Sequence, residues 1–565
     1  MRNRNMTNRK SYAVLLLVPI VIAVGISCTK LDAKVYSVVP NANFWQTPAE
    51  IAAGVAPAYA ALTAIPGGNT FEVNEVSSDE IVIPIRGADW LDNNVHIQEW
   101  LHNWPNDNAN INGAWGDIYN GIGKANFTLN VVNSLATPPS NLAAINAELK
   151  SLRDYYYFLA IDMFGNVPYV TSFNVDPSSV KNDLGRAAIY DSIVTDLKNN
   201  IPLLATNVDA STYGRLTKWG ALTILAKLYM NAQVYTGSQA GTPGTADWAD
   251  ALSTLDQIIA SGAYSLQSNY FDNFAINNST ILAGGENIFV VPFDKVNIGG
   301  DNMEMMTLHY QNNINFNLTG SPWNGFCTTA DYYANFDTTS VYTVKGTTTF
   351  RTYLDQRAGQ FLIGQQYNMP YSYPPSTNVV YSADPSLIIN DLQFSIPLIF
   401  NPVVPQLSNA SGPFRGAGLR DIKYFPEAGT AGNQSNDMVL FRLSDIYLMR
   451  AEADLRLNGS ISGTSLGYIN AVRERAYGGD ASHDWTAPQA TLDNILAERA
   501  REVTWEGWRR NDLIRYEMAN PGTKYFSGPR NPQKTQDPAD NHLMIFPIPT
   551  QQITANPNLV QNPGY

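Results

Sequence analysis

The sequence predicts a mainly α-helical protein, in which helix pairs that resemble tetratricopeptide units form a scaffold and a loop-rich, irregular insertion adds short strands. Two observations predict this fold class. Segments with a helical hydrophobic period recur along the chain, and most are joined by short connections, as in antiparallel helix pairs. Between about residues 261 and 441, however, Asn, Thr, Tyr, Gly and Pro dominate, and alternating runs such as Asn287–Val291 are short. Aromatic residues stay frequent there, so we expect ordered loops and short strands.

The first predicted helix begins after Thr47, which fits an N-cap, with Pro48 in the first turn and Glu50 completing a capping box. It ends at Pro66, which two glycines follow. Within residues 143–164, apolar side chains at helical spacing share one face, namely Leu152, Tyr155, Tyr156, Leu159 and Met163. The complete set of further predicted helices is Ile111–Leu135, Ala143–Phe164, Ala187–Leu204, Lys218–Tyr235, Trp248–Ser261, Phe441–Leu457, Gly467–Arg475 and Thr491–Met518.

These patterns predict one domain over residues 41–565. Its helical scaffold is expected at about residues 41–66, 110–261 and 441–520. Two loop-rich elaborations, at about residues 67–109 and 262–440, lie between the scaffold segments. We expect the ligand-binding groups on these two elaborations, because both combine aromatic side chains with amides.

The N-terminus has the form of a secretory signal. A basic segment that includes Arg2 and Lys10 precedes the uncharged apolar run Tyr12–Ile26, which is too short to span a bilayer of roughly 30 Å. We expect residues 1–27 to be a signal peptide, Cys28 to receive lipid, and residues 28–40 to form a tether. The alternative is a plain cleaved signal that leaves an unmodified cysteine. After the signal peptide, we expect no further run of eighteen apolar residues.

Charge and cysteine content limit the classes of partner. The net charge is −13, and removal of residues 1–27 makes the chain still more acidic, which argues against nucleic acid and anionic lipid surfaces as partners. If Cys28 is lipidated, Cys327 has no cysteine to pair with, so stability depends on core burial. Cys327 is expected to be a small apolar or semi-buried residue.

Several segments form an ordered set along the chain. They are Arg153–Phe158 with Asp162–Pro168, Gly214–Lys218 with Ala226–Tyr229, Arg442–Ala453, Ile469–Arg473, Glu498–Glu502, Trp505–Leu513, Phe546–Pro549 and Asn556–Tyr565. Together they resemble the SusD/RagB family of Bacteroidota lipoproteins. The resemblance covers nearly the whole chain after the signal. It implies an outer-membrane lipoprotein that faces outward, carries four tetratricopeptide-like helix pairs and has no chemistry of its own. It also implies a partner TonB-dependent transporter of the SusC type, to which a glycan, or in some members a peptide, is presented.

The loop segments contain the residue types that bind sugars. Flat C–H faces of sugars stack on Trp and Tyr, and their hydroxyls pair with Asp, Asn and Arg. The candidate ligand-binding residues form two groups, Asp79, Arg86, Trp90, Asp92 and Asn93 in the first elaboration and Tyr310, Trp323 and Asn324 in the second. Three other tryptophans, Trp100, Trp104 and Trp115, are expected to pack the scaffold.

Patterns that suggest catalysis have structural explanations. Glu498, Glu502 and Glu506 share a helix face but alternate with arginines, which predicts a structural ion network. Gly463–Gly467 matches a nucleophile elbow but follows a helix, so Ser465 is expected to cap the next helix. The spacing of His96 and His102 fits no zinc motif. We therefore expect no enzyme activity, no cofactor and no metal site, although calcium held by loop oxygens stays open.

The expected function is glycan capture and delivery to a transporter. Three alternatives remain: a peptide or other oligomer binder, a structural or adhesin-like surface protein, and a surface glycoside hydrolase. The hydrolase needs two carboxylates that flank the scissile bond, for which Asp79 and Asp92 are the candidates.

Overall fold

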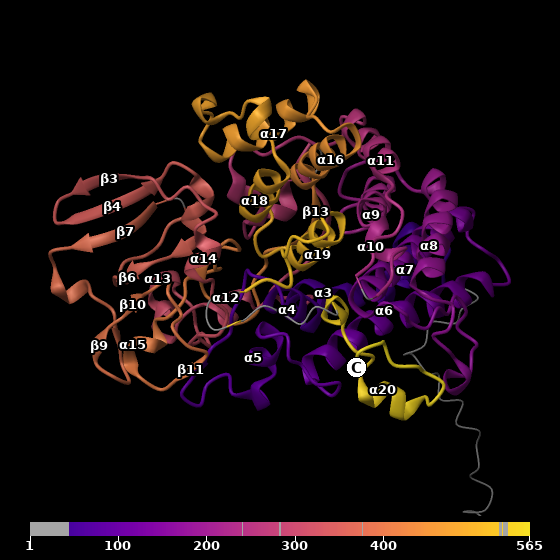
Figure 1. Ribbon diagram of the computed structural model, residues 1–565, viewed down its shortest axis with the longest axis horizontal. Helices are drawn as coiled ribbons and strands as arrows, with labels where there is room; N and C mark the ends of the chain where they lie inside the picture. Colours follow the sequence, from indigo (N-terminus) through magenta and orange to yellow (C-terminus); the bar gives the residue numbers. More distant parts are fainter. Residues whose placement is uncertain (1–43, 240, 282–283, 376, 530–533, 535–540) are drawn as a thin grey trace, which may run out of the picture.

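Packed helices fill one side of the molecule, and short strands with long connections fill the other (Figure 1). The computed structural model describes residues 44–565 except 240, 282–283, 376, 530–533 and 535–540. The predicted signal peptide, lipidation site Cys28 and tether 28–40 lie outside the described residues.

Most of the helices lie outside the insertion. They are α2 (Pro48–Ala60), α3 (Ala64–Gly67), α4 (Asn69–Val76), α5 (Val95–Trp100), α6 (Ala109–Asn133), α7 (Leu142–Phe164), α8 (Arg186–Asn200), α9 (Lys218–Met230), α10 (Ala232–Tyr235), α11 (Trp248–Ala260), α16 (Leu443–Asn458), α17 (Gly463–Ala476), α18 (Leu492–Glu502), α19 (Arg509–Ala519) and α20 (Thr550–Ala555). Helices α6 and α7, α9 and α11, and α16 and α17 pack as pairs, and α11 also packs on α16. The predicted capping box is confirmed. Thr47 Oγ1 accepts a hydrogen bond from the backbone amide of Glu50, and the Glu50 carboxylate accepts one from the backbone amide of Thr47.

The insertion contains short elements. Its helices are α12 (Met303–Thr307), α13 (Asn313–Phe316), α14 (Ala330–Tyr333) and α15 (Gly412–Arg415). The strands of the molecule are β1 (Ile85–Arg86), β2 (Asn287–Val291), β3 (Ser340–Lys345), β4 (Thr348–Tyr353), β5 (Phe361–Leu362), β6 (Gly364–Gln365), β7 (Thr377–Ser382), β8 (Asn390–Asp391), β9 (Ile396–Pro397), β10 (Ile399–Phe400), β11 (Ser408–Asn409), β12 (Arg420–Asp421) and β13 (Met438–Arg442). Strands β3, β4 and β7 form an antiparallel sheet, and the other strands pair in twos, with only β1 and β11 parallel among the named pairs.

The predicted fold class is confirmed, with local differences in the bounds of several elements. Residues 69–76 form α4 inside the predicted loop region; α4 is buried on every side, so it shows no amphipathic period. Phe441 and Arg442 belong to β13, which pairs with β2, and the helix begins only at Leu443. The predicted helix Thr491–Met518 is two helices, α18 and α19.

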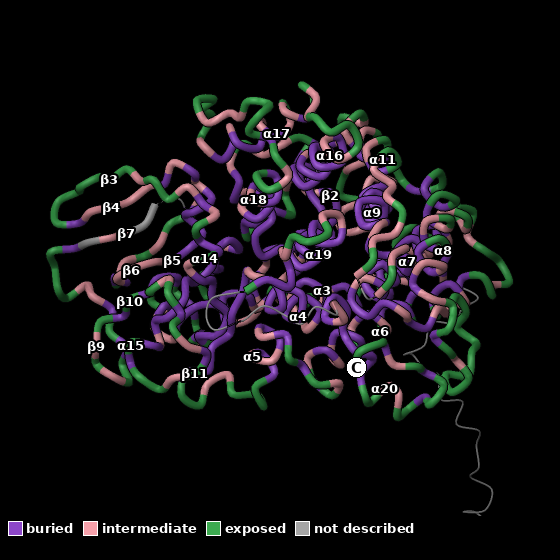
Figure 2. Tube along the Cα trace, viewed as in Figure 1, coloured by how far each residue is buried: buried purple, intermediate pink, exposed green. Residues whose placement is uncertain are grey.

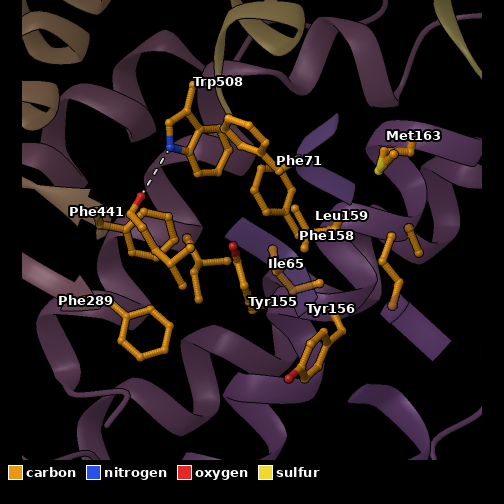
Figure 3. Packing of buried hydrophobic residues seen from close by; sticks show 14 of the residues in the cluster. Ile65, Phe71, Tyr155, Tyr156, Phe158, Leu159, Met163, Phe289, Phe441 and Trp508 are labelled. Atoms are coloured by element: carbon orange, nitrogen blue, oxygen red, sulfur yellow. Dashed lines mark hydrogen bonds between the residues drawn. The ribbon is translucent and has the colours of Figure 1, made fainter. Parts of the chain in front are cut away.

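The core is built around α7. Tyr155, Tyr156 and Phe158 are fully buried, and Tyr155 meets Phe441 of β13 edge-on with ring centroids 5.7 Å apart. Trp508 stacks near Phe158 and donates its indole hydrogen to the Leu440 carbonyl at 3.2 Å (Figure 3). The core therefore joins the first half of the scaffold to the elements after the insertion.

A buried ion network ties α18 to the insertion. Glu498 and Glu502 are fully buried, and both pair with Arg357, which comes from a 3₁₀ turn of the insertion. Arg442 of β13 donates to Glu502 and to Glu506, which lies beyond the end of α18. The predicted structural role of these glutamates is confirmed, but Glu506 does not share their helix face. Figure 2 shows the buried interior that this network crosses.

One described stretch, Pro48–Val76, is long and apolar enough to cross a membrane by length and composition. The expectation that no such stretch follows the signal is therefore wrong by this measure. The stretch folds as α2, α3 and α4, and α4 is buried from Thr70 to Val76. A core helix of a folded domain has the same composition.

Candidate ligand-binding surface

Three of the predicted aromatic residues lie on segments that hydrogen bond to one another, although they come from distant parts of the chain. The indole of Trp90 donates to the Trp323 carbonyl at 2.7 Å, and Ser321 of the same loop donates to the Tyr310 carbonyl at 3.0 Å. Trp323 is 42% exposed, whereas Trp90 and Tyr310 are half-buried. We call Trp90, Tyr310 and Trp323 the aromatic surface.

The loop that carries Trp90 has an unusual backbone. Trp90, Asp92, Asn93 and Asn94 all have positive φ, at 59°, 29°, 53° and 64°. Such conformations cost free energy in residues with a Cβ and persist where surrounding contacts hold them, often at binding sites. Gly325 packs beneath the Trp90 ring, where a Cβ would lie 2.2 Å from a ring carbon, so only glycine fits there.

A charged pair borders the aromatic surface. The Arg415 guanidinium lies over the Tyr310 ring at 4.4 Å and pairs with Asp391 at 2.7 Å and with Asp89 at 3.6 Å. The Tyr310 hydroxyl donates to Asp89. Burial and this hydrogen bond raise the pKa of Tyr310 to about 12, so the hydroxyl keeps its proton at neutral pH. Asp89 and Arg415 thus offer an acceptor and a donor beside the Tyr310 ring.

Arg86 and Asn324 lie beneath this surface. Arg86 is 1% exposed and donates from Nη1 to the Asn324 carbonyl at 2.8 Å and from Nη2 to the Ala417 carbonyl at 2.8 Å. The Asn324 side chain is fully buried and accepts from Arg420 Nη2 at 2.7 Å. These two predicted ligand residues are placed to support the loops and do not face outward.

The remaining predicted residues are separate from the rings or at their edge. Asp79 accepts two hydrogen bonds from Arg509, at 2.7 and 2.9 Å, and so belongs to the scaffold side of the first elaboration. Asp92 and Asn93 are exposed at the tip of the Trp90 loop. Asp89 and Arg415 were not predicted; Asp89 adjoins Trp90 in sequence, but nothing local marks Arg415.

Other predictions about single residues have clear outcomes. Trp100, Trp104 and Trp115 are buried in the core, and Cys327 is fully buried, as predicted. Ser465 does not cap α17: the cap is Ser462, whose hydroxyl accepts from the Ser465 amide at 3.2 Å. The Ser465 hydroxyl is buried and donates to Asp454 at 2.5 Å.

A cleft of about 600 Å³ lies away from the aromatic surface. Trp115 and Tyr119 stack in its wall with centroids 4.6 Å apart, and Phe173, 46% exposed, stands at its edge. None of the predicted ligand residues lines this cleft. It is the rival location for a ligand.

Known proteins are similar to this chain in sequence and in fold. A sequence model described as the SusD family matches residues 285–565, and one described as "Starch-binding associating with outer membrane" matches residues 32–230. The chain is 25% identical to the starch-binding protein SusD of Bacteroides thetaiotaomicron over 515 residues, which are 88% of this chain and 85% of that protein. It is 24% identical to SusD-like protein P25 of Formosa agariphila over 557 residues, 95% of this chain and 97% of that protein.

Solved structures agree. A SusD superfamily protein from Parabacteroides distasonis superposes with a TM-score of 0.67 at 19% identity, covering 92% of this chain and 99% of that structure. Surface glycan-binding protein A from Bacteroides thetaiotaomicron, in complex with laminarihexaose, gives a TM-score of 0.61 at 20% identity, covering 91% of this chain and 99% of that structure. The helical scaffold, the matched segments and these similarities lead to one conclusion: the chain belongs to the SusD/RagB family.

Proposed function

We propose that this protein is a surface-exposed lipoprotein that binds an oligo- or polysaccharide and delivers it to a partner SusC-like TonB-dependent transporter of the outer membrane. The observation that supports glycan binding most directly is the aromatic surface, where an exposed Trp323 stands beside Trp90 and Tyr310. The names of two relatives, the starch-binding SusD and the laminarihexaose complex, support the same ligand class.

The chemistry of the aromatic surface suits a sugar chain. An exposed indole offers a flat apolar face against which the C–H face of a pyranose can stack. Asp89 accepts hydrogen bonds from sugar hydroxyls, and Arg415 donates to them. Because Trp90 and Tyr310 are held by hydrogen bonds to the Trp323 loop and to Asp89, the surface is organised before the ligand arrives.

Isothermal titration with a panel of oligosaccharides tests the proposal. Trp323→Ala is expected to weaken glycan binding at least about tenfold, because truncation of an aromatic anchor removes the stacking area. Phe173→Ala, at the rival cleft, is the matched control and is expected to leave affinity unchanged. Loss of binding in Phe173→Ala alone would move the ligand to that cleft.

The same titrations separate the other functions. Saturable binding of peptides without glycan binding would favour the oligomer-binding alternative. Absence of saturable binding to any soluble ligand would favour a structural or adhesin-like role. New reducing ends during incubation with an oligosaccharide would show hydrolase activity and would contradict the proposal of a non-enzymatic binding protein.

Membrane anchoring and transporter delivery need a separate test. Cys28→Ala is expected to shift the exported protein from the outer-membrane fraction to the soluble fraction, because buried acyl chains supply the anchor. Purification of the wild-type protein from native membranes is expected to recover a TonB-dependent transporter. Retention of Cys28→Ala in the membrane would contradict the lipid anchor.

A further inference from the structure

Behind the aromatic surface, three metal-ligating side chains converge. Glu72 of α4 and His96 and Glu99 of α5 bring one ligand atom each to within 4.8 Å of one another. His96 Nδ1 lies 2.5 Å from Glu72 Oε1. All three residues are buried, with Glu99 fully inaccessible. The spacing of His96 and Glu99 places both on one face of α5.

The buried carboxylate of Glu99 indicates that this cluster binds a cation. Neither of its oxygens receives a hydrogen bond of normal geometry within the described residues, although the amides of Asn108 and Asn110 lie near enough to lower its pKa. Burial and the charge of Glu72 nevertheless raise the pKa of Glu99 well above its ordinary value. A buried carboxylate without a partner is costly unless a proton or a cation satisfies it.

The surroundings of His96 are those of a metal-bound imidazole. Its second ring nitrogen, Nε2, lies 3.3 Å from Asp92 Oδ2, which is the carboxylate contact that orients many metal-ligating histidines. Asn110 Nδ2 lies 2.7 Å from Glu72 Oε1 and 3.5 Å from His96 Nδ1. Rotation of this amide would present its oxygen to the same point.

We propose that Glu72, His96 and Glu99 form a binding site for a divalent transition metal of the zinc class, with Asp92 as the residue that positions His96. One imidazole and two carboxylates are a ligand set that zinc accepts, with water or the Asn110 oxygen as the fourth ligand. Bonds of about 2.0–2.2 Å separate tetrahedral ligands by roughly 3.3 Å, so the contact between Glu72 and His96 must open.

The charges at the site also favour a cation. Glu72 and Glu99 both place a carboxylate oxygen within 4.8 Å of His96 in a buried position. A dication at this point would compensate both buried carboxylates at once.

This site lies directly under the loop of the aromatic surface. The Trp90 ring meets the His96 ring edge-on, with centroids 5.5 Å apart. Asp92, which contacts His96, has φ of 29° in the same loop. Metal binding would therefore hold the left-handed loop 90–94 against α4 and α5. The inference does not depend on the nature of the proposed ligand.

Zinc titration of the purified, tag-free protein after chelator treatment tests the site. Calorimetry is expected to show saturable binding of one zinc ion per chain, and thermal denaturation is expected to show a higher Tm with zinc. Glu99→Gln removes a ligand and is expected to abolish this binding. Asp92→Asn is expected to weaken it about 10–100-fold, as for other residues that orient a ligand.

His102→Gln is the matched control, since His102 is buried nearby but contacts the Ser77 carbonyl and not the three ligands. It is expected to keep wild-type zinc affinity. If the wild-type protein shows no saturable zinc binding, the proposal is wrong. This test uses the wild-type protein alone and is therefore valid even if Glu99→Gln fails to fold. Unchanged binding in a folded Glu99→Gln, or binding of calcium in place of zinc, would overturn it as well.

Discussion

Arg86 shows how a charged residue in a binding loop can be structural. Its guanidinium is buried, and it donates to the carbonyls of Asn324, Gly325 and Ala417, at 2.8, 3.0 and 2.8 Å. Gly325 in turn contacts the Trp90 ring. Arg86 therefore fixes the backbone of both loops that carry the aromatic surface.

Replacement of Arg86 is expected to affect stability more than any direct ligand contact. Arg86→Met should lower the free energy of unfolding by about 2 kcal/mol or more, because the buried carbonyls of Asn324 and Gly325 lose their donor at about 1–3 kcal/mol each. The Ala417 carbonyl keeps a second donor, Arg420 Nη1, at 3.0 Å. Urea denaturation followed by tryptophan fluorescence measures the change. Trp323→Ala serves as the control, with weaker glycan binding and nearly wild-type stability. Wild-type stability in Arg86→Met would contradict this role.

Sequence alone marks the residue types of the surface but not which of them face outward. Trp90, Tyr310 and Trp323 are predicted and do come together, whereas Arg86 and Asn324 fit the same chemical description and are buried. The difference arises from contacts between distant segments: Arg86 meets the Ala417 carbonyl across 331 positions. No local pattern encodes such a contact, and Arg415 was missed for the same reason.

At the scale of elements, the break between α18 and α19 shows what the hydrophobic period cannot resolve. Residues 491–518 keep a helical pattern, but the chain turns after Glu502. Trp505 has φ of 55° and Gly507 has φ of 81°, so two left-handed residues reverse the chain. The turn brings Trp508 into the core and Glu506 to Arg442. Tertiary contacts thus decide the helix boundary.

The left-handed turn makes a prediction about Gly507. Gly507→Ala is expected to lower the free energy of unfolding by about 1–2 kcal/mol, because a Cβ disfavours positive φ. Steric overlap is not the cause, since the added Cβ would meet Phe71 only at 3.9 Å. Thermal denaturation measures the change. Gly463→Ala, at the start of α17 with open space around it, should be neutral or stabilising. Equal Tm values for the two variants would refute the argument.

At the scale of the molecule, the insertion and the scaffold are held together as one folding unit. Arg357 of the insertion is fully buried and pairs with Asp355, Glu498 and Glu502. Removing one partner of such a buried network leaves an uncompensated charge. The helical period predicts the scaffold well, but it says nothing of this junction. The sequence of the irregular insertion has no sustained hydrophobic period, so its strand pairing could not be predicted.

Buried acids also set how the whole molecule responds to pH. Burial raises the pKa of Asp301 to about 8 and that of Asp421 to about 7. Their folded-state pKa values exceed the unfolded value of about 3.9, so the folded state holds protons that the unfolded state has released. The stability they contribute is present below about pH 4 and is lost as pH rises through 7–8. His309 opposes this trend at lower pH, because burial lowers its pKa to about 4.

The protein is therefore expected to lose thermal stability as pH rises from about 5 to 9. Below about pH 6.5, the ordinary pKa of an unfolded histidine, His309 offsets part of this loss, because one histidine opposes two buried aspartates. Asp301→Asn should flatten this loss, because the amide cannot ionise, whereas the wild-type carboxyl must either keep its proton or be buried as a charge. Tm values at pH 5, 7 and 9 measure the slope. Asp294→Asn is the control. Asp294 is half-buried, and it accepts hydrogen bonds from the Asn297 and Val296 amides, which lower its pKa, so it stays ionised throughout this range. The two aspartates lie in the same segment and differ mainly in burial, so this variant isolates the effect of burial. If the Tm of Asp301→Asn falls with pH as steeply as that of the wild type, burial of Asp301 does not govern the response.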